Sequence, residues 1–121
     1  MPIVDIEIIP KPEEIIRDEI VQELADQLGE IFGSPKGGTW VKIRELTENH
    51  YAENGGKEEG VYPIFVSVLK SRLPSPDELQ KEVKRITGAV AQICGRSTEN
   101  VHVIYHSEGK GRVAFGGKIV T

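Results

Sequence analysis

The chain has 121 residues, of which 38% are hydrophobic and 28% charged, and its formal net charge is -4. These values are typical of one globular domain that buries enough surface to fold without disulfides or a structural metal. Acidic and basic residues are interleaved without a basic stripe, which argues against a nucleic-acid partner. The longest apolar runs fall short of the ~20 residues that a membrane-spanning helix needs. The single cysteine, Cys94, and the lack of a signal-like segment predict a cytoplasmic protein.

Two short motifs recur 61 residues apart in the chain. Pro2-Ile3 returns as Pro63-Ile64, and the glycine pair at 55–56 returns at 116–117. Between these motifs each half runs through a β-branched stretch, a helical stretch and a second β-branched stretch. The sequence therefore predicts a single domain over 1–121, made of two βαβ repeats at 2–56 and 62–120.

In the first half, residues 3–9 alternate apolar and polar side chains, which predicts a strand with one buried face. Residues 13–32 carry apolar side chains at helical spacing and predict one long helix that ends at Gly33. Residues 40–46 alternate again and predict a second strand, followed by turn-forming residues at 49–56. This second strand places three side chains that could face a ligand on one side: Trp40, Lys42 and Arg44.

In the second half, residues 62–69 form a nearly continuous apolar run, which is typical of a strand covered on both faces. Ser75 followed by Pro76 and Glu78 is a capping box with proline at the first helical position, and it predicts a helix that Gly95 ends. We expect a fourth strand over 101–106 and a closing hairpin or edge strand over 112–120.

Two βαβ units of this kind predict an α+β fold with both helices on one face of a four-stranded sheet, plus hairpins. The crossovers should be right-handed, as nearly all such connections are. No third helix is predicted to cover the other face of the sheet. We therefore expect several copies of the chain to pack together through that face.

Pro2 is the first candidate for chemistry because it follows the initiator Met1. If Met1 is removed, the chain begins with a secondary amine. Burial in an apolar pocket, or cations nearby, would disfavour the protonated amine and leave it free to act as a general base. The structural alternative is that Pro2 merely starts a strand, where its missing N–H does no harm.

Together these features resemble the tautomerase superfamily, specifically a fused two-unit relative of 4-oxalocrotonate tautomerase. The resemblance rests on Pro2-Ile3-Val4 at the start, the repeated βαβ unit, the segment from His50 and Tyr51 to the first glycine pair, and its counterpart at 115–117. It implies a cofactor-independent isomerase that moves a proton on a small enol or α-keto carboxylate, with Pro2 as general base and acid, in a homotrimer. The alternatives are a hydratase, dehalogenase or decarboxylase of the same superfamily, or a non-catalytic trimeric binding protein.

The resemblance also implies an arginine after the first strand that binds the substrate carboxylate. Pro12 stands there in the first half. In the second half Arg72 takes that place if Tyr62 is aligned with the catalytic proline, whereas the strict repeat spacing selects Leu73. We prefer Arg72, with Lys70 on the same strand end; the alternative is that Arg72 is a solvated loop cation.

A second arginine of the family, on the second strand, aligns here with Trp40 in the first half and His102 in the second. The usual electrophile is therefore absent, and Lys42, Arg44 or His102 could replace it. Tyr51 aligns with the hairpin aromatic of the family, so Trp40, Tyr51 and His102 are expected to shape the pocket. Trp40 and His102 could instead serve packing alone. No residues have metal-ligand spacing and the glycine pairs lack a phosphate-binding motif, so we expect neither metal nor nucleotide cofactor.

Overall fold

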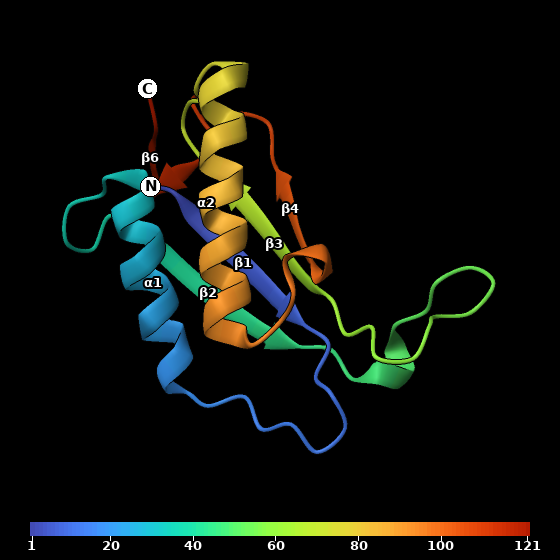
Figure 1. Ribbon diagram of the computed structural model, residues 1–121. Coiled ribbons are helices and arrows are strands. Elements are labelled where there is room, and N and C mark those ends of the chain that lie inside the picture. Colours follow the sequence, from blue (N-terminus) through green and yellow to red (C-terminus); the bar gives the residue numbers. More distant parts are fainter.

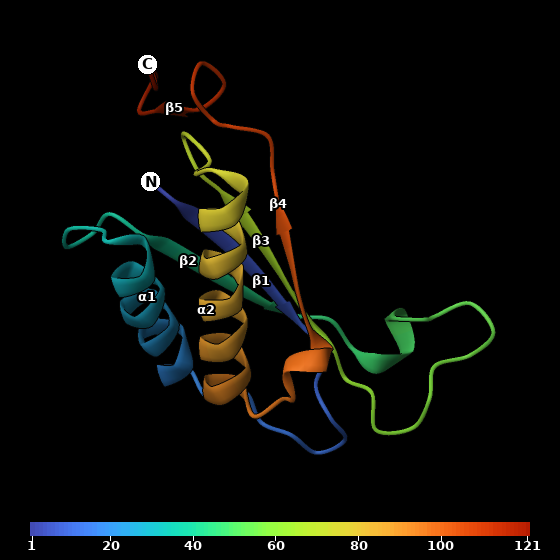
Figure 2. The ribbon, with the colours of Figure 1, turned by 45° about the horizontal axis from the view of Figure 1, so that its top comes forward.

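A computed structural model describes all residues of the chain, 1–121 (Figure 1). Its elements are β1 (Ile3–Ile8), α1 (Glu19–Phe32), β2 (Trp40–Glu45), a 3-10 helix (Glu48–His50), β3 (Ile64–Leu69), α2 (Pro76–Cys94), a second 3-10 helix (Thr98–Asn100), β4 (Val101–Tyr105), β5 (Ala114–Phe115) and β6 (Lys118–Ile119). The main sheet has the order β2-β1-β3-β4, in which β1 and β3 are antiparallel and both outer pairs are parallel. Both helices cover the same face (Figures 1 and 2). The predicted α+β arrangement of two βαβ units is confirmed.

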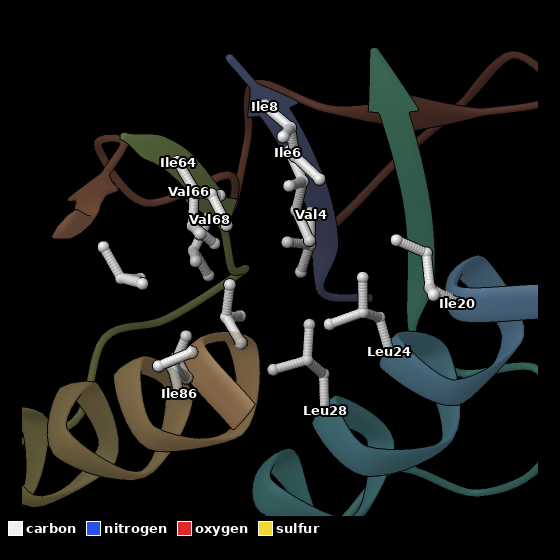
Figure 3. Packing of buried hydrophobic residues seen from close by; sticks show 13 residues of the cluster. Val4, Ile6, Ile8, Ile20, Leu24, Leu28, Ile64, Val66, Val68 and Ile86 are labelled. Carbon is white, nitrogen blue, oxygen red and sulfur yellow. The ribbon is translucent and has the colours of Figure 1, made fainter. Parts of the chain in front are cut away.

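The core lies between this face of the sheet and the two helices (Figure 3). Every second side chain of β1 and β3 points into it, as the alternation in the sequence predicts. The fully buried residues of these two strands are Val4, Ile6, Ile8, Ile64, Val66 and Val68. Apolar side chains at helical spacing on α1 and α2 pack against these residues. Neither helix is long and apolar enough to cross a membrane. The shared core therefore holds the two halves together as one unit.

The first helix begins at Glu19, so the prediction of a helix from residue 13 is wrong for its first six positions. Glu13 has a left-handed backbone with φ of 63°, which a helix does not tolerate. Glu14 lies beside the C-terminal end of α2, where its two carboxylate oxygens are 2.7 and 2.8 Å from the guanidinium nitrogens of Arg96. Residues 10–18 are therefore a loop, and Ile15 within it is 85% exposed.

The second helix begins as predicted. Ser75 is its N-cap, and its hydroxyl accepts a hydrogen bond from the Glu78 backbone N–H at 3.4 Å. Pro76 occupies the first turn, and Gly95 ends the helix in the left-handed conformation with φ of 67°. Local signals suffice here because the cap, the proline and the glycine act within a few residues of each other.

The two glycine pairs have different surroundings. Gly116 and Gly117, with φ of 57° and 89°, form the tight turn between β5 and β6, as predicted. The segment 46–63 instead holds a 3-10 helix and a loop that extends away from the sheet in both views (Figures 1 and 2). Its residues from 52 to 60 are polar or glycine apart from one alanine, so they offer no β-branched pairs from which strands could form.

Candidate active site

Pro2 is buried at the start of β1. Its carbonyl oxygen accepts a hydrogen bond from the Trp40 N–H at 3.0 Å, which extends the β1–β2 ladder by one step. On the other side, Ile3 pairs with Leu69 of antiparallel β3, so the next position in that register sets Lys70 across from Pro2. Because side chains alternate along β1, Pro2 points to the helix side, as Val4 does. Pro2 therefore lies between the start of β2 and the end of β3.

A half-buried charged network occupies the same end of the sheet. The ammonium of Lys70 lies 2.7 Å from Glu82 Oε1, and the side chains are only 18% and 13% exposed. The Tyr105 hydroxyl donates to the other carboxylate oxygen at 2.7 Å. Burial, and then the hydrogen bond to Glu82, raises the pKa of Tyr105, so the phenol keeps its proton. The ammonium also lies 5.1 Å from the centre of the Phe32 ring.

Glu82 and Tyr105 are not among the predicted site residues. The sequence does contain a signal for this network. The alternation of β3 and β4 places Lys70 and Tyr105 on the sheet face that should be apolar. Polar side chains at core positions normally have a partner. The partner, Glu82, comes from α2, and sequence spacing alone does not pair it with β3 and β4.

Trp40 lies beside Pro2 on the opposite, open face of the sheet. It is 50% exposed, and its indole N–H donates to the Gly37 carbonyl at 3.0 Å. Its ring meets that of Phe115 edge-on, with the ring centres 5.2 Å apart. This contact sets the β5–β6 hairpin over the end of the sheet where Pro2 lies.

Arg72 lies in the loop after β3, at the same end of the sheet as Pro2. Its side chain is exposed and makes no hydrogen bond or ion pair within the chain. The alternative, Leu73, is half-buried, and its backbone N–H donates to a Glu108 carboxylate oxygen at 2.7 Å. Between these two neighbours, only Arg72 has a free cation that can reach an anionic ligand.

Tyr51 and His102 lie at the other end of the sheet. Both pack near Phe65, with ring centres 5.9 Å from Tyr51 and 5.5 Å from His102. Phe65 is four positions from Leu69, so this aromatic cluster is roughly 13 Å along β3 from the Pro2 end. The Tyr51 hydroxyl donates to Glu53 at 2.6 Å, and that bond is the main reason why its pKa rises to about 12. Within one chain these two residues do not meet Pro2.

Lys42 and Arg44 share the open face with Trp40, as the sequence predicts, and their side chains are 65% exposed. The Lys42 ammonium lies 3.2 Å from Asp5 Oδ1, and the Arg44 guanidinium lies 3.9 Å from Glu7. Asp5 Oδ1 is buried, yet no donor reaches it in hydrogen-bond geometry, so the Lys42 contact is electrostatic. Both cations are therefore engaged by acidic side chains of β1. No group of three or more His, Cys, Asp or Glu side chains is placed so that it could hold a metal ion.

No protein-family model matches the chain, and no curated protein matches it. Solved structures do match over nearly its whole length. A fused 4-OT designated F6, an asymmetric trimer, has a TM-score of 0.78 at 11% identity and covers 97% of this chain and 94% of its own. Pt0534 inactivated by 2-oxo-3-pentynoate has a TM-score of 0.77 at 16% identity, covering 97% and 95%.

A macrophage migration inhibitory factor homologue from Prochlorococcus marinus has a TM-score of 0.75 at 15% identity, covering 98% of this chain and 99% of its own. At this level of identity the comparisons establish the fold. The chain has the fold of the tautomerase superfamily, in agreement with the resemblance seen in its sequence.

Proposed function

We propose that the protein is a cofactor-independent tautomerase that moves a proton on a small enol or α-keto carboxylate, with Pro2 as base and acid once Met1 is removed. The carrying observation is the position of Pro2, buried at the start of β1 and across from Lys70. Burial disfavours a positive charge on the Pro2 amine. A neutral secondary amine accepts a proton from carbon.

The proposed step needs one base and one cation. The Pro2 nitrogen takes a proton from the carbon next to the substrate carbonyl, and the C–H electron pair moves to form an enolate. The protonated amine then gives the proton to the enolate oxygen, which yields the enol. Arg72 fits the carboxylate, because a guanidinium binds it through two parallel hydrogen bonds.

The proposed assembly is a homotrimer. Apart from the contact between Phe115 and Trp40, the open face of the sheet carries no covering layer within the chain. Trp40 and Ile104 on this face are 50% and 51% exposed. The fused 4-OT with the same fold is a trimer. Tyr51 and His102, which lie far from Pro2 in their own chain, would then line the pocket of a neighbouring protomer. In this proposal each chain contributes two βαβ repeats, residues 2–56 and 62–120, and works in the cytoplasm.

The Pro2 amine is tested by its reaction with 2-oxo-3-pentynoate, whose conjugated alkyne adds an amine. The nitrogen lone pair would form a bond to C4, the alkyne carbon farther from the ketone, one π bond of the alkyne would break, and a proton would add to C3. We expect one equivalent of this compound on the N-terminal peptide of the processed protein. Mass spectrometry that finds Met1 retained, or the label elsewhere, contradicts the proposal.

Proton transfer is tested with the Pro2→Ala variant on an enolised α-keto acid and on a halogenated acid. A loss of at least about 100-fold in kcat/KM with the keto acid alone supports the tautomerase. Turnover of the halogenated acid indicates the hydratase or dehalogenase alternative. Equal binding and no turnover in both proteins indicates a binding protein.

A further inference from the structure

The side chain of Met1 has a defined seat against Gly109. Gly109 is buried, and it is not among the glycines with a left-handed backbone, so other residues could adopt its φ. What a larger residue lacks there is space. A Cβ at Gly109 would lie 2.8 Å from Met1 Cε, 3.0 Å from a methyl carbon of Val113 and 3.4 Å from the Lys70 carbonyl oxygen. The missing side chain of Gly109 therefore makes room for Met1.

The space that Met1 fills begins at the Pro2 nitrogen, the proposed catalytic base. The carbonyl carbon of Met1 is bonded to the Pro2 nitrogen, and the Met1 side chain runs from there to Gly109. The Gly109 N–H donates to the Lys70 carbonyl at 2.8 Å. This hydrogen bond holds Gly109 beside the end of β3, which lies across from Pro2. Removal of Met1 leaves a half-buried space that begins at the amine and ends at Gly109 and Val113.

We infer that this space is the subsite for the apolar tail of the substrate, with Gly109 and Val113 setting its depth; the inference rests on the proposed function. A reacting carbon about 3–3.5 Å from the Pro2 nitrogen would lie beyond the former Cα of Met1. The Met1 atoms beyond Cβ are Cγ, Sδ and Cε, and the space that they vacate holds about three unbranched carbons. The ligand class is a straight-chain 2-oxo acid with a tail of that length beyond C3.

The experiment follows hydrogen–deuterium exchange at C3 of straight-chain 2-oxo acids by proton NMR in D₂O. The Pro2 amine takes a proton from C3, the C–H pair forms the C2=C3 bond of the enolate, and the protonated amine returns a deuteron from solvent. The series runs from pyruvate to 2-oxoheptanoate. For the processed protein we expect kcat/KM to rise about fourfold per methylene up to 2-oxohexanoate, the factor that corresponds to burying one CH₂.

Two variants shift this limit in opposite directions. Gly109→Ala shortens the subsite, so the value for 2-oxohexanoate should fall about fourfold while that for 2-oxobutanoate stays unchanged. Val113→Ala lengthens it, so 2-oxoheptanoate should gain about fourfold. Gly88→Ala is the matched control, because Gly88 lies on the exposed surface of α2 and a Cβ there meets nothing within 4 Å.

The outcomes separate the two proposals. If kcat/KM for exchange does not vary with chain length, or varies equally in the wild type and all three variants, the subsite is wrong and the proposed function is unaffected. No exchange in the processed wild-type protein, or retention of Met1, overturns both. If Gly109→Ala does not fold, the response of Val113→Ala to 2-oxoheptanoate decides.

Discussion

Arg96 is the charged residue that ties the loop before α1 to the rest of the fold. Its side chain is 2% exposed, and its guanidinium donates to Glu14 and to three backbone carbonyls, those of Ile9, Tyr62 and Cys94. One side chain thus joins the segments that follow β1, precede β3 and follow α2. A buried guanidinium is costly unless all of these partners remain.

The first prediction concerns Glu14, which carries the charge that balances Arg96. We expect Glu14→Ala to lower the free energy of unfolding by about 2 kcal/mol, because Arg96 would stay buried without a counter-ion but keep its carbonyl partners. Urea denaturation measures the loss. The control is Lys81→Ala, whose exposed pair with Glu78 at 3.5 Å should cost less than about 1 kcal/mol. Equal losses in the two variants would contradict this role of Arg96.

The second prediction is a pH dependence of the same contact. The hydrogen bond to Arg96 is the main reason why the pKa of Glu14 is below its ordinary value of 4.5; burial opposes the shift. A lowered pKa adds stability that is fully present above pH 4.5 and disappears as the pH falls through the lowered value. The difference in unfolding free energy between wild type and Glu14→Gln should therefore shrink on acidification, as denaturation at a series of pH values would show. A difference that grows on acidification would have the wrong sign.

At the scale of elements, the two helices follow different rules. The start of α2 is defined by its own residues, and the start of α1 by the distant Arg96. The alternation of β1 and β3 is likewise local, whereas the polar side chains at the ends of β3 and β4 depend on Glu82 of α2. Features with complete local signals could be predicted, whereas the start of α1 and the pairing of the polar side chains at the ends of β3 and β4 could not.

The third prediction tests the backbone of α2. Gly88 lies in the middle of this helix with open space around its Cα, so Gly88→Ala should raise the free energy of unfolding by about 1 kcal/mol through helix propensity. Gly95→Ala should act in the opposite direction, because Gly95 ends the helix with φ of 67°. Thermal or urea unfolding of the two variants checks both signs. A stabilising effect of Gly95→Ala would contradict the assignment of the helix end.

At the scale of the whole molecule, the chain is a two-layer unit with one face left open. Asp5 and Glu7 on that face are matched by Lys42 and Arg44, so its charged part is paired within the chain. Ile104, on the edge strand β4, belongs to its apolar part. A contiguous apolar patch rimmed by polar residues marks a contact surface between proteins, and the proposed trimer interface would include Ile104.

The fourth prediction follows from the proposed trimer. Ile104→Glu should dissociate it, because a carboxylate buried between protomers has no partner there. Sedimentation velocity would show a monomer in place of the trimer. Ile15→Glu is the control, since Ile15 is 85% exposed in the loop before α1, away from the open face. Dissociation by both variants, or by neither, would contradict this assignment of the interface.

The sequence by itself determined the order of strands and helices, the two faces of β1 and the caps of α2, because these depend on alternation, periodicity and residues a few positions apart. It also singled out Pro2 and Arg72, which the fold brings to one end of the sheet. Only the tertiary structure decided that α1 begins late, that Lys70 pairs with Glu82, and that Tyr51 and His102 lie far from Pro2. Those features depend on contacts between segments distant in the chain, which no local pattern records. Local patterns in the 121 residues thus place most of the elements, whereas the start of α1 and the arrangement of the candidate site depend on tertiary contacts.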